Sequence, residues 1–145
     1  MRDQGVLWRA SRDPTPWLSL STGGFVLAVA ALRLAGVPPV DIHGPLHRLG
    51  IMDPLCGGTR ATYLLASGDF SAAAEYNPVV FPLAVVVAAL AVRLVLGIAL
   101  GSWLQVRVPR PARRPLLAAF MIAVTLLEIR QQLHAELLMQ PWSGP

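Results

Sequence analysis

The sequence predicts an all-α integral membrane protein with three transmembrane helices and a short interfacial helical hairpin. Hydrophobic residues make up 54% of the 145 residues, and charged residues only 14%, against about 25% in a typical soluble domain. Three apolar runs are each long enough to cross a bilayer. The basic residues, all of them arginine, gather in short segments beside these runs. This pattern excludes intrinsic disorder, a long coiled coil and most soluble folds.

The three predicted spans follow from hydropathy and helix boundary signals. Residues 18–37 cover roughly 30 Å as a helix, one hydrocarbon thickness, and the run ends at Pro38. Residues 79–104 form the most apolar run, and Asn77 is suited to cap its start. Residues 116–138 begin fully apolar and continue as a helical stripe with polar residues on its other faces. We therefore expect one continuous helix in each segment.

Arginine distribution predicts the orientation in the membrane. A polar tail (1–17) and the segment 105–114 are arginine-rich, whereas the loop 38–77 carries mixed charge. The positive-inside rule then predicts a multi-pass membrane protein with a cytoplasmic N-terminus. The single membrane domain is 18–138, followed by a short tail, 139–145. Membrane lipids are the expected partner, and nucleic acid is not, because four arginines lie in one short inter-span segment: Arg107, Arg110, Arg113 and Arg114.

Two of the charges within the predicted spans lie at comparable distances from the turn between the last two spans. Arg93 and Glu128 lie 17 and 18 residues from position 110, where the last two spans turn. In an antiparallel hairpin they reach nearly the same depth, so the first prediction is an ion pair between them, serving helix register or a proton or ion path. The alternative is that Arg93 extends towards the inner interface, where its guanidinium reaches a more polar environment.

The outer loop is predicted to contain a helical hairpin. Residues 59–67 and 70–76 have the composition of two short helices. Gly57-Gly58 allows a sharp entry, Gly68 a C-terminal stop, and Asp69 is suited to cap the second helix. The apolar side chains of this hairpin predict that it lies at the membrane interface.

Three motifs of this loop resemble a known family. They are the run from Asp53 to Ala61 (DPLCGGTRA), the triplet Gly68-Asp69-Phe70 and the pair Asn77-Pro78. In this order they resemble the bacterial membrane family catalogued as domain of unknown function 2752, whose first motif cysteine is replaced here by Asp53. The resemblance implies a location in a bacterial plasma membrane and no established activity. The residues that occupy its motif positions are Cys56, Gly57, Thr59, Arg60, Asp69, Asn77 and Pro78.

Three interpretations of the loop remain open. The first is a transition-metal site, since thiolate, imidazole and carboxylate ligands all occur: His43, His47, Asp53 and Cys56. The second is an anion site for a lipid phosphate, formed by the free N–H groups of Gly57, Gly58 and Thr59 together with Arg60. The third is structural, with the glycines making a turn and Cys56 buried as a small apolar residue. No cofactor is required by the sequence, although a metal is possible.

The sequence contains no arrangement that predicts an enzyme. No catalytic triad or dyad, phosphate-loop or dinucleotide fingerprint is present. The leading expectation is therefore a non-enzymatic accessory or scaffolding subunit, with other membrane protein subunits as partners. The alternative is a metal- or anionic-headgroup-binding protein that uses the loop from Asp53 to Arg60. A small transporter or proton-path component ranks third, on Arg93 and Glu128 alone.

Overall fold

The computed structural model describes residues 7–38, 49–142 and 144. Its elements, in chain order, are β1 (Leu7–Ala10), α1 (Pro16–Ala35), α3 (Gly58–Ser67), α4 (Phe70–Tyr76), α5 (Val80–Leu100), β2 (Trp103–Val106), α6 (Arg110–Leu133) and α7 (Ala135–Met139). Helices α1, α5 and α6 are long and apolar enough to cross a membrane. The predicted all-α membrane fold is confirmed, with one small sheet added.

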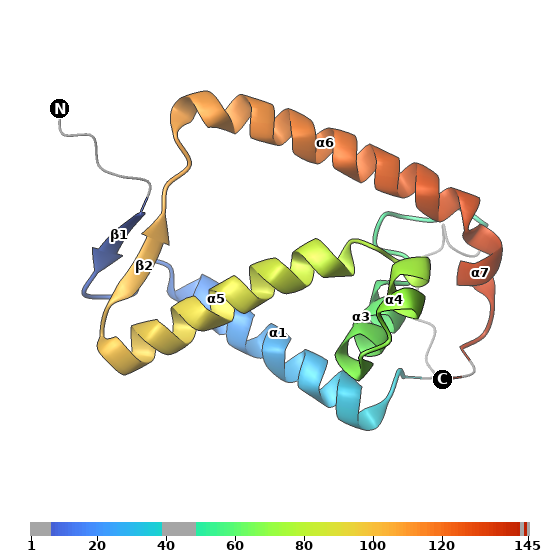
Figure 1. Ribbon diagram of the computed structural model, residues 1–145, viewed down its shortest axis with the longest axis horizontal. Helices are drawn as coiled ribbons and strands as arrows, with labels where there is room; N and C mark the ends of the chain where they lie inside the picture. Colours follow the sequence, from blue (N-terminus) through green and yellow to red (C-terminus); the bar gives the residue numbers. More distant parts are fainter. Residues whose placement is uncertain (1–6, 39–48, 143, 145) are drawn as a thin grey trace.

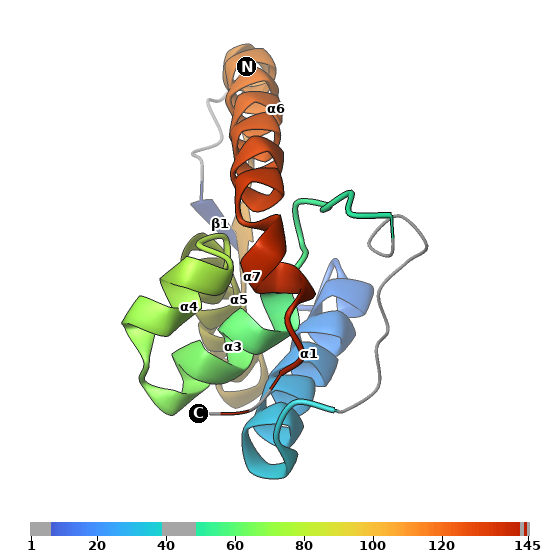
Figure 2. The ribbon, with the colours of Figure 1, turned by 90° about the vertical axis from the view of Figure 1, so that its right-hand side faces the viewer.

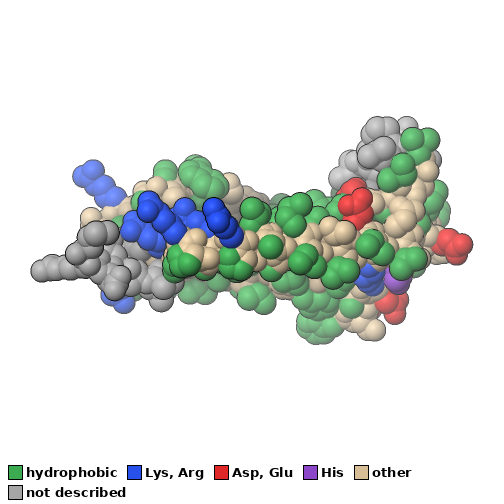
Figure 3. Space-filling view, turned by 90° about the horizontal axis from the view of Figure 1, so that it is seen from above, with side chains coloured by type: hydrophobic (Ala, Val, Ile, Leu, Met, Phe, Trp, Pro, Cys, Tyr) green, Lys and Arg blue, Asp and Glu red, His purple; other side chains and the backbone are tan. Residues whose placement is uncertain are grey.

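The molecule is elongated, and its two ends differ in chemistry. We call the end formed by β1, β2 and the arginines at 107, 110, 113 and 114 the arginine end. The other end, formed by residues 49–76 and α7, is the hairpin end (Figure 1). On the face drawn in Figure 3, arginine side chains cover one end and acidic side chains lie towards the other, with apolar side chains between them. This is the charge pattern expected of a membrane-spanning bundle.

The observed spans differ from the predicted ones chiefly in α6. This helix begins at Arg110, six residues before the predicted start, because arginine and alanine favour helix and Pro111 fits its first turn. It ends at Leu133, where the backbone N–H of His134 donates to the carbonyls of Arg130 and Gln131. The predicted continuation to residue 138 is instead the separate short helix α7.

The small sheet corrects the prediction for both arginine-rich segments. Strand β1 pairs antiparallel with β2, in a register that places Leu7 opposite Val106 and Ala10 opposite Trp103. The segment 1–17 is therefore not simply a polar tail, nor is 105–114 simply a loop. Pairing between segments about 100 residues apart depends on how α1 and α5 are placed, so neither segment carries a strong local signal for it.

The core of the described chain lies at the hairpin end. Two adjoining clusters of buried apolar side chains are centred on Leu64 and on Met52. Helix α1 packs on α5, and α3 packs on both, whereas α6 packs substantially only on α7 among the helices and strands. Figures 1 and 2 both show α6 apart from α1, and Figure 1 shows α1 and α5 crossing each other. Most side chains of the three spans are consequently left bare for lipid or protein partners.

Candidate functional site

The motif loop folds locally as predicted. Gly57 has φ 74° at the entry to α3 and Gly68 has φ 87° at its exit, a left-handed conformation that favours glycine. The carboxylate of Asp69 accepts a hydrogen bond of 3.0 Å from the backbone N–H of Ala72, which confirms the predicted cap of α4. The predicted hairpin, 59–67 and 70–76, matches α3 and α4 to within one residue.

Asn77 connects the motif loop to the start of α5. Its side-chain amide donates to the carbonyls of Pro54 and Cys56, each at 3.0 Å, and its amide oxygen accepts from the backbone N–H of Val79 at 3.0 Å. Asn77 is fully buried. The N-cap residue of α5 is Val79 rather than the predicted Asn77, because a turn at Pro78 and Val79 precedes the helix. Asn77 instead holds this turn and also fixes the fold of the loop before α3.

Three consecutive polar side chains at the end of α6 dock onto this loop. The amide of Gln131, fully buried, donates to the carbonyls of Cys56 and Tyr76. Arg130 donates to the carbonyl of Ala74 at 2.8 Å and to the side-chain oxygen of Gln131. Gln132 accepts from the backbone N–H of Met52 at 3.0 Å and donates to the carbonyl of Gly50. We call Arg130, Gln131 and Gln132 the α6 latch.

The sequence pattern does not predict the α6 latch. It accounts for these residues only as polar faces of the predicted third span. The available signal was a run of two glutamines beside an arginine at the end of an apolar helix, since amides placed there need carbonyl or N–H partners. The partners lie more than 50 residues away, so the run by itself does not identify them.

Cys56 is buried within the hairpin-end core. Its side chain is 3% exposed, and its Sγ lies 3.4 Å from Sδ of Met52. Leu138 packs in the same cluster. This is the environment of a small apolar core residue, as the structural interpretation of the loop expects.

The start of α3 is covered rather than open to an anion. A Cβ on Gly57 would lie only 2.6 Å from Cδ2 of Leu138 and 3.1 Å from the carbonyl oxygen of Tyr76. Arg60 contacts the same residue, because its Nη1 lies 3.3 Å from the carbonyl oxygen of Leu138. The guanidinium carbon also lies 5.7 Å from the ring centre of Tyr76 and 5.8 Å from that of Trp142. These contacts engage the cation within the chain.

Of the four candidate metal ligands, Asp53 and Cys56 lie in the described part of the chain. His43 and His47 lie outside the described residues. Asp53 is exposed, and its Oδ1 accepts from the backbone N–H of Leu55 at 2.7 Å, whereas Cys56 is buried. Within residues 7–38, 49–142 and 144, no three potential histidine, cysteine or carboxylate ligands gather in one place.

Arg93 pairs with Asp13, not with Glu128. Its Nη2 lies 2.7 Å from Oδ1 of Asp13, and Nη1 donates to Ser19 at 3.0 Å. Nε donates to the carbonyl of Leu104 at 2.9 Å, and the ring centre of Trp103 lies 5.1 Å from the guanidinium carbon. The predicted Arg93–Glu128 pair is wrong, and Arg93 instead extends towards the arginine end, in the direction that the alternative expects.

The reason for this correction is depth. Arg93 precedes the end of α5 by seven residues, about 10 Å of helix, while Glu128 follows the start of α6 by 18 residues, about 27 Å. The prediction counted residues from position 110 as if both helices reached that point. Because residues 101–109 lie between α5 and α6, Arg93 is closer to the arginine end than that count gives. The proton-path expectation, which depended on this pair, loses its support.

The Asp13 carboxylate is held ionised beside Arg93. Desolvation by itself raises the pKa of Asp13, but hydrogen bonds from Ser19, from Arg93 and from the backbone N–H of Thr15 outweigh it. The net effect places the pKa of Asp13 below its ordinary value of 3.8. This cluster therefore ties the start of α1 to α5 as a charged pair at neutral pH.

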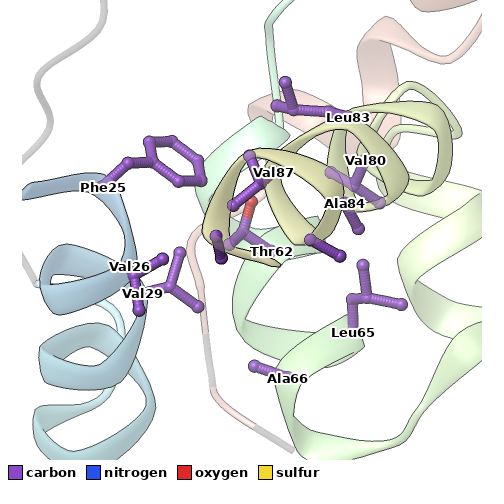
Figure 4. A pocket seen from close by; sticks show the side chains of 12 residues that line it. Phe25, Val26, Val29, Thr62, Leu65, Ala66, Val80, Leu83, Ala84 and Val87 are labelled. Atoms are coloured by element: carbon purple, nitrogen blue, oxygen red, sulfur yellow. The ribbon is translucent and has the colours of Figure 1, made fainter. Parts of the chain in front are cut away.

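An apolar cavity of about 280 Å³ lies between α1, α3 and α5. Figure 4 shows aliphatic and aromatic side chains of the three helices pointing into it, including Phe25, Leu65 and Val87. Its one hydroxyl, that of Thr62, donates to the carbonyl of Gly58 at 2.7 Å. The lining thus has no charged group with which to hold a hydrophilic ligand.

Comparison with known families addresses the motif segment. Residues 45–91 match the model of a family described as "Protein of unknown function (DUF2752)". The segment is DUF2752-like. This confirms the resemblance expected from the motifs, over roughly a third of the chain. No curated protein and no solved structure matches the chain.

The DUF2752 match extends from the motif loop through α3 and α4 into α5. It includes Asn77, Cys56 and Arg60, whose contacts were described above, but not the α6 latch or Asp13. The latch therefore joins the DUF2752 segment to a part of the chain outside the match. The protein is thus a multi-pass helical membrane protein with a segment that is similar to a family of unknown function.

Proposed function

We propose that this protein is a non-enzymatic accessory or scaffolding subunit of a membrane complex, with membrane lipids and other membrane protein subunits as its partners. The observation that carries the proposal is the contrast between its polar groups and its apolar faces. The motif side chains Asn77, Arg60 and Cys56 are engaged in internal contacts. The spans, in contrast, leave most of their apolar surface uncovered.

The arrangement of α6 supports an assembly role. The helix is tethered at both ends: β2 precedes it on the small sheet, and the α6 latch holds its other end on the motif loop. Between these tethers its side chains are largely exposed, including Phe120, Ile122 and Leu126. A helix that presents a fixed, uncovered apolar face within a membrane is suited to bind another membrane helix.

Binding of a metal or an anionic headgroup at the loop from Asp53 to Arg60 is the alternative, and the geometry favours it less. Leu138 covers the start of α3, and Arg60 already contacts Leu138, Tyr76 and Trp142. Metal analysis of the purified protein before and after Cys56→Ser tests the metal version. Lipid analysis before and after Arg60→Ala tests the headgroup version.

Purification from native membranes tests the proposed function. The tagged full chain is solubilised in a mild detergent after brief chemical cross-linking, and the cross-linked species are identified by mass spectrometry. We expect one or more other membrane proteins to be recovered in fixed proportion. Replacing three exposed α6 residues, as in Phe120→Ala, Ile122→Ala and Leu126→Ala combined, should reduce this recovery, while Leu20→Ala on α1 serves as the control. A chain that is recovered alone in every detergent contradicts the proposal.

A further inference from the structure

Away from the arginine end, two charged side chains on the spans have no partner in the described part of the chain. Arg33 lies in the last turn of α1, and Glu128 lies on α6, five residues before its end. Both are exposed, and neither forms a hydrogen bond or ion pair with any described residue. An unpaired charge on a lipid-facing helix is unfavourable, so an opposite charge supplied by another molecule would stabilise each side chain.

The two side chains lie at matching depth. Arg33 follows the start of α1 by 17 residues and Glu128 follows the start of α6 by 18 residues. At 1.5 Å per residue these separations are about 26 Å and about 27 Å. Both helices start at the arginine end and run towards the hairpin end (Figure 1). The opposite charges are therefore in register along the membrane normal.

Within one chain the two side chains are kept apart. Helix α1 packs against α5, while α6 makes no comparable contact with α1 and lies apart from it in both ribbon views (Figures 1 and 2). The α6 latch and the β1–β2 sheet hold α6 there at its two ends. An ion pair between Arg33 and Glu128 of the same copy would require α6 to leave the latch.

We propose that a second copy of this chain binds along α6, with Glu128 of one copy paired to Arg33 of the other. Among the described residues of the spans away from the arginine end, Glu128 and Arg33 are one such carboxylate and one such guanidinium, so a two-fold dimer pairs both groups in both copies. Copies with the same membrane orientation keep the depth match, because rotation about the membrane normal changes no depth.

Apolar side chains around both charges fit the same interface. Leu34 beside Arg33 is 88% exposed, and Leu126 and Ile129 near Glu128 are exposed as well. Pairing α1 with α6 between copies surrounds the ion pair with these side chains and removes it from lipid. The inference rests on the proposed function because both assume that the exposed apolar faces of the spans serve assembly. It adds that the partner is a second copy of this chain.

Disulfide cross-linking in membranes tests the contact directly. Two differently tagged copies are co-expressed, one with Arg33→Cys and one with Glu128→Cys, and oxidised; in a two-fold dimer the second ion pair stays intact. We expect a cross-linked product that carries both tags. The matched control replaces Arg33→Cys with Leu20→Cys, an exposed position on the same helix near the arginine end, and should give no product. Buried Cys56 is common to all samples.

Charge reversal provides a second measurement. Glu128→Arg or Arg33→Glu alone should weaken self-association about tenfold, the scale of a coupled pair, and combining both in every copy should restore it. Equal cross-linking with Leu20→Cys, or no rescue by the double reversal, overturns the inference. Recovery of other membrane proteins with no cross-linked dimer retains the proposed function and rejects the second copy. A cross-linked dimer that purifies without any other protein supports the second copy and contradicts the proposed function.

Discussion

Asn77 uses both amide protons and its carbonyl oxygen within the chain. These three hydrogen bonds join the motif loop to the first turn of α5 in a fully buried position. Arg93 is used in a similar way, with acceptors from Asp13, Thr15, Ser19 and the carbonyl of Leu104. Such residues look functional in the sequence because they are polar, yet their partners show that they hold helices together.

Replacing Asn77 should destabilise the protein. Asn77→Ala leaves the carbonyls of Pro54 and Cys56 without their donor, which costs about 1–3 kcal/mol for buried groups. Thermal unfolding in detergent, followed by loss of helical circular dichroism, should show a lower midpoint. Thr59→Ala is the matched control, because Thr59 is another motif position but is exposed. Equal midpoints for both variants contradict the role given to Asn77.

The Asp13–Arg93 pair should make stability depend on pH in the acid range. Because the folded pKa of Asp13 is below 3.8, its ionised form stabilises the fold fully above that pH. This contribution is lost as the pH falls through the lowered folded value. Asp13→Asn should therefore be less stable than the native chain at neutral pH. The difference should shrink below about pH 3.8, as measured by unfolding midpoints in detergent; a difference that is constant with pH excludes the mechanism.

At the scale of elements, glycines decide where helices end and how closely side chains approach. Gly57 needs a left-handed backbone and lies against Leu138, while its neighbour Gly58 has open space around it. On α5, a Cβ on Gly97 would overlap the ring of Trp103, which in turn lies over Arg93. The first contact joins the start of α3 to α7, which is far away in the sequence, and the second joins α5 to the strand β2 that follows it.

The adjacent glycines at the start of α3 offer a matched pair of substitutions. Gly57→Ala should cost about 1–3 kcal/mol, because the left-handed conformation and the contact with Leu138 both oppose a Cβ. Gly58→Ala should be neutral or slightly stabilising, since alanine favours helix and no atom lies within 4 Å. The unfolding midpoints of the two variants, measured in the same detergent, test this prediction. A larger loss of stability for Gly58→Ala than for Gly57→Ala contradicts the left-handed conformation at Gly57.

The α6 latch should control access to Cys56. In the native chain Cys56 is 3% exposed, so alkylation by a small maleimide should be slow. Gln131→Ala removes the donor to the carbonyls of Cys56 and Tyr76 and loosens this end of α6. We expect alkylation, followed by intact mass, to accelerate at least about tenfold, the effect of roughly 1.4 kcal/mol on the opening equilibrium. Unchanged alkylation contradicts this role, and Gln140→Ala, an exposed glutamine, serves as the control.

At the scale of the whole molecule, three bare helices connect two ends of different charge. Arginines gather at one end, and the hairpin with its acidic residues forms the other. The first turn of α6 carries Arg110 and Arg113 with no acidic residue, although the helix dipole disfavours cations there. The placement of these arginines is thus better explained by membrane topology than by helix stability.

We expect the arginine end to lie in the cytoplasm, as the positive-inside rule predicts. In a Cys56→Ser background, a cysteine at exposed Ser71 should react with a membrane-impermeant maleimide in intact cells. A cysteine at exposed Arg113 should react only after the cells are permeabilised. Labelling is compared on gels before and after permeabilisation. The reverse pattern would show that the predicted orientation is inverted.

The sequence by itself determined the three spans, the helical hairpin and its caps, and the family resemblance. These features depend on local quantities: hydropathy summed along a helix, a left-handed glycine at Gly68, and a carboxylate at Asp69 within reach of the next turn. Each can be evaluated within a few residues, so no knowledge of distant segments is needed.

Only the tertiary structure decided which partners the polar side chains find. Arg93 meets Asp13 rather than Glu128, Gln131 meets Cys56, and β1 pairs with β2. These choices depend on helix depth and lateral position, which follow from how α1, α3 and α5 pack and from where α6 is held. Side chains of similar chemistry are interchangeable in a one-dimensional pattern, but distance in the folded chain selects one of them.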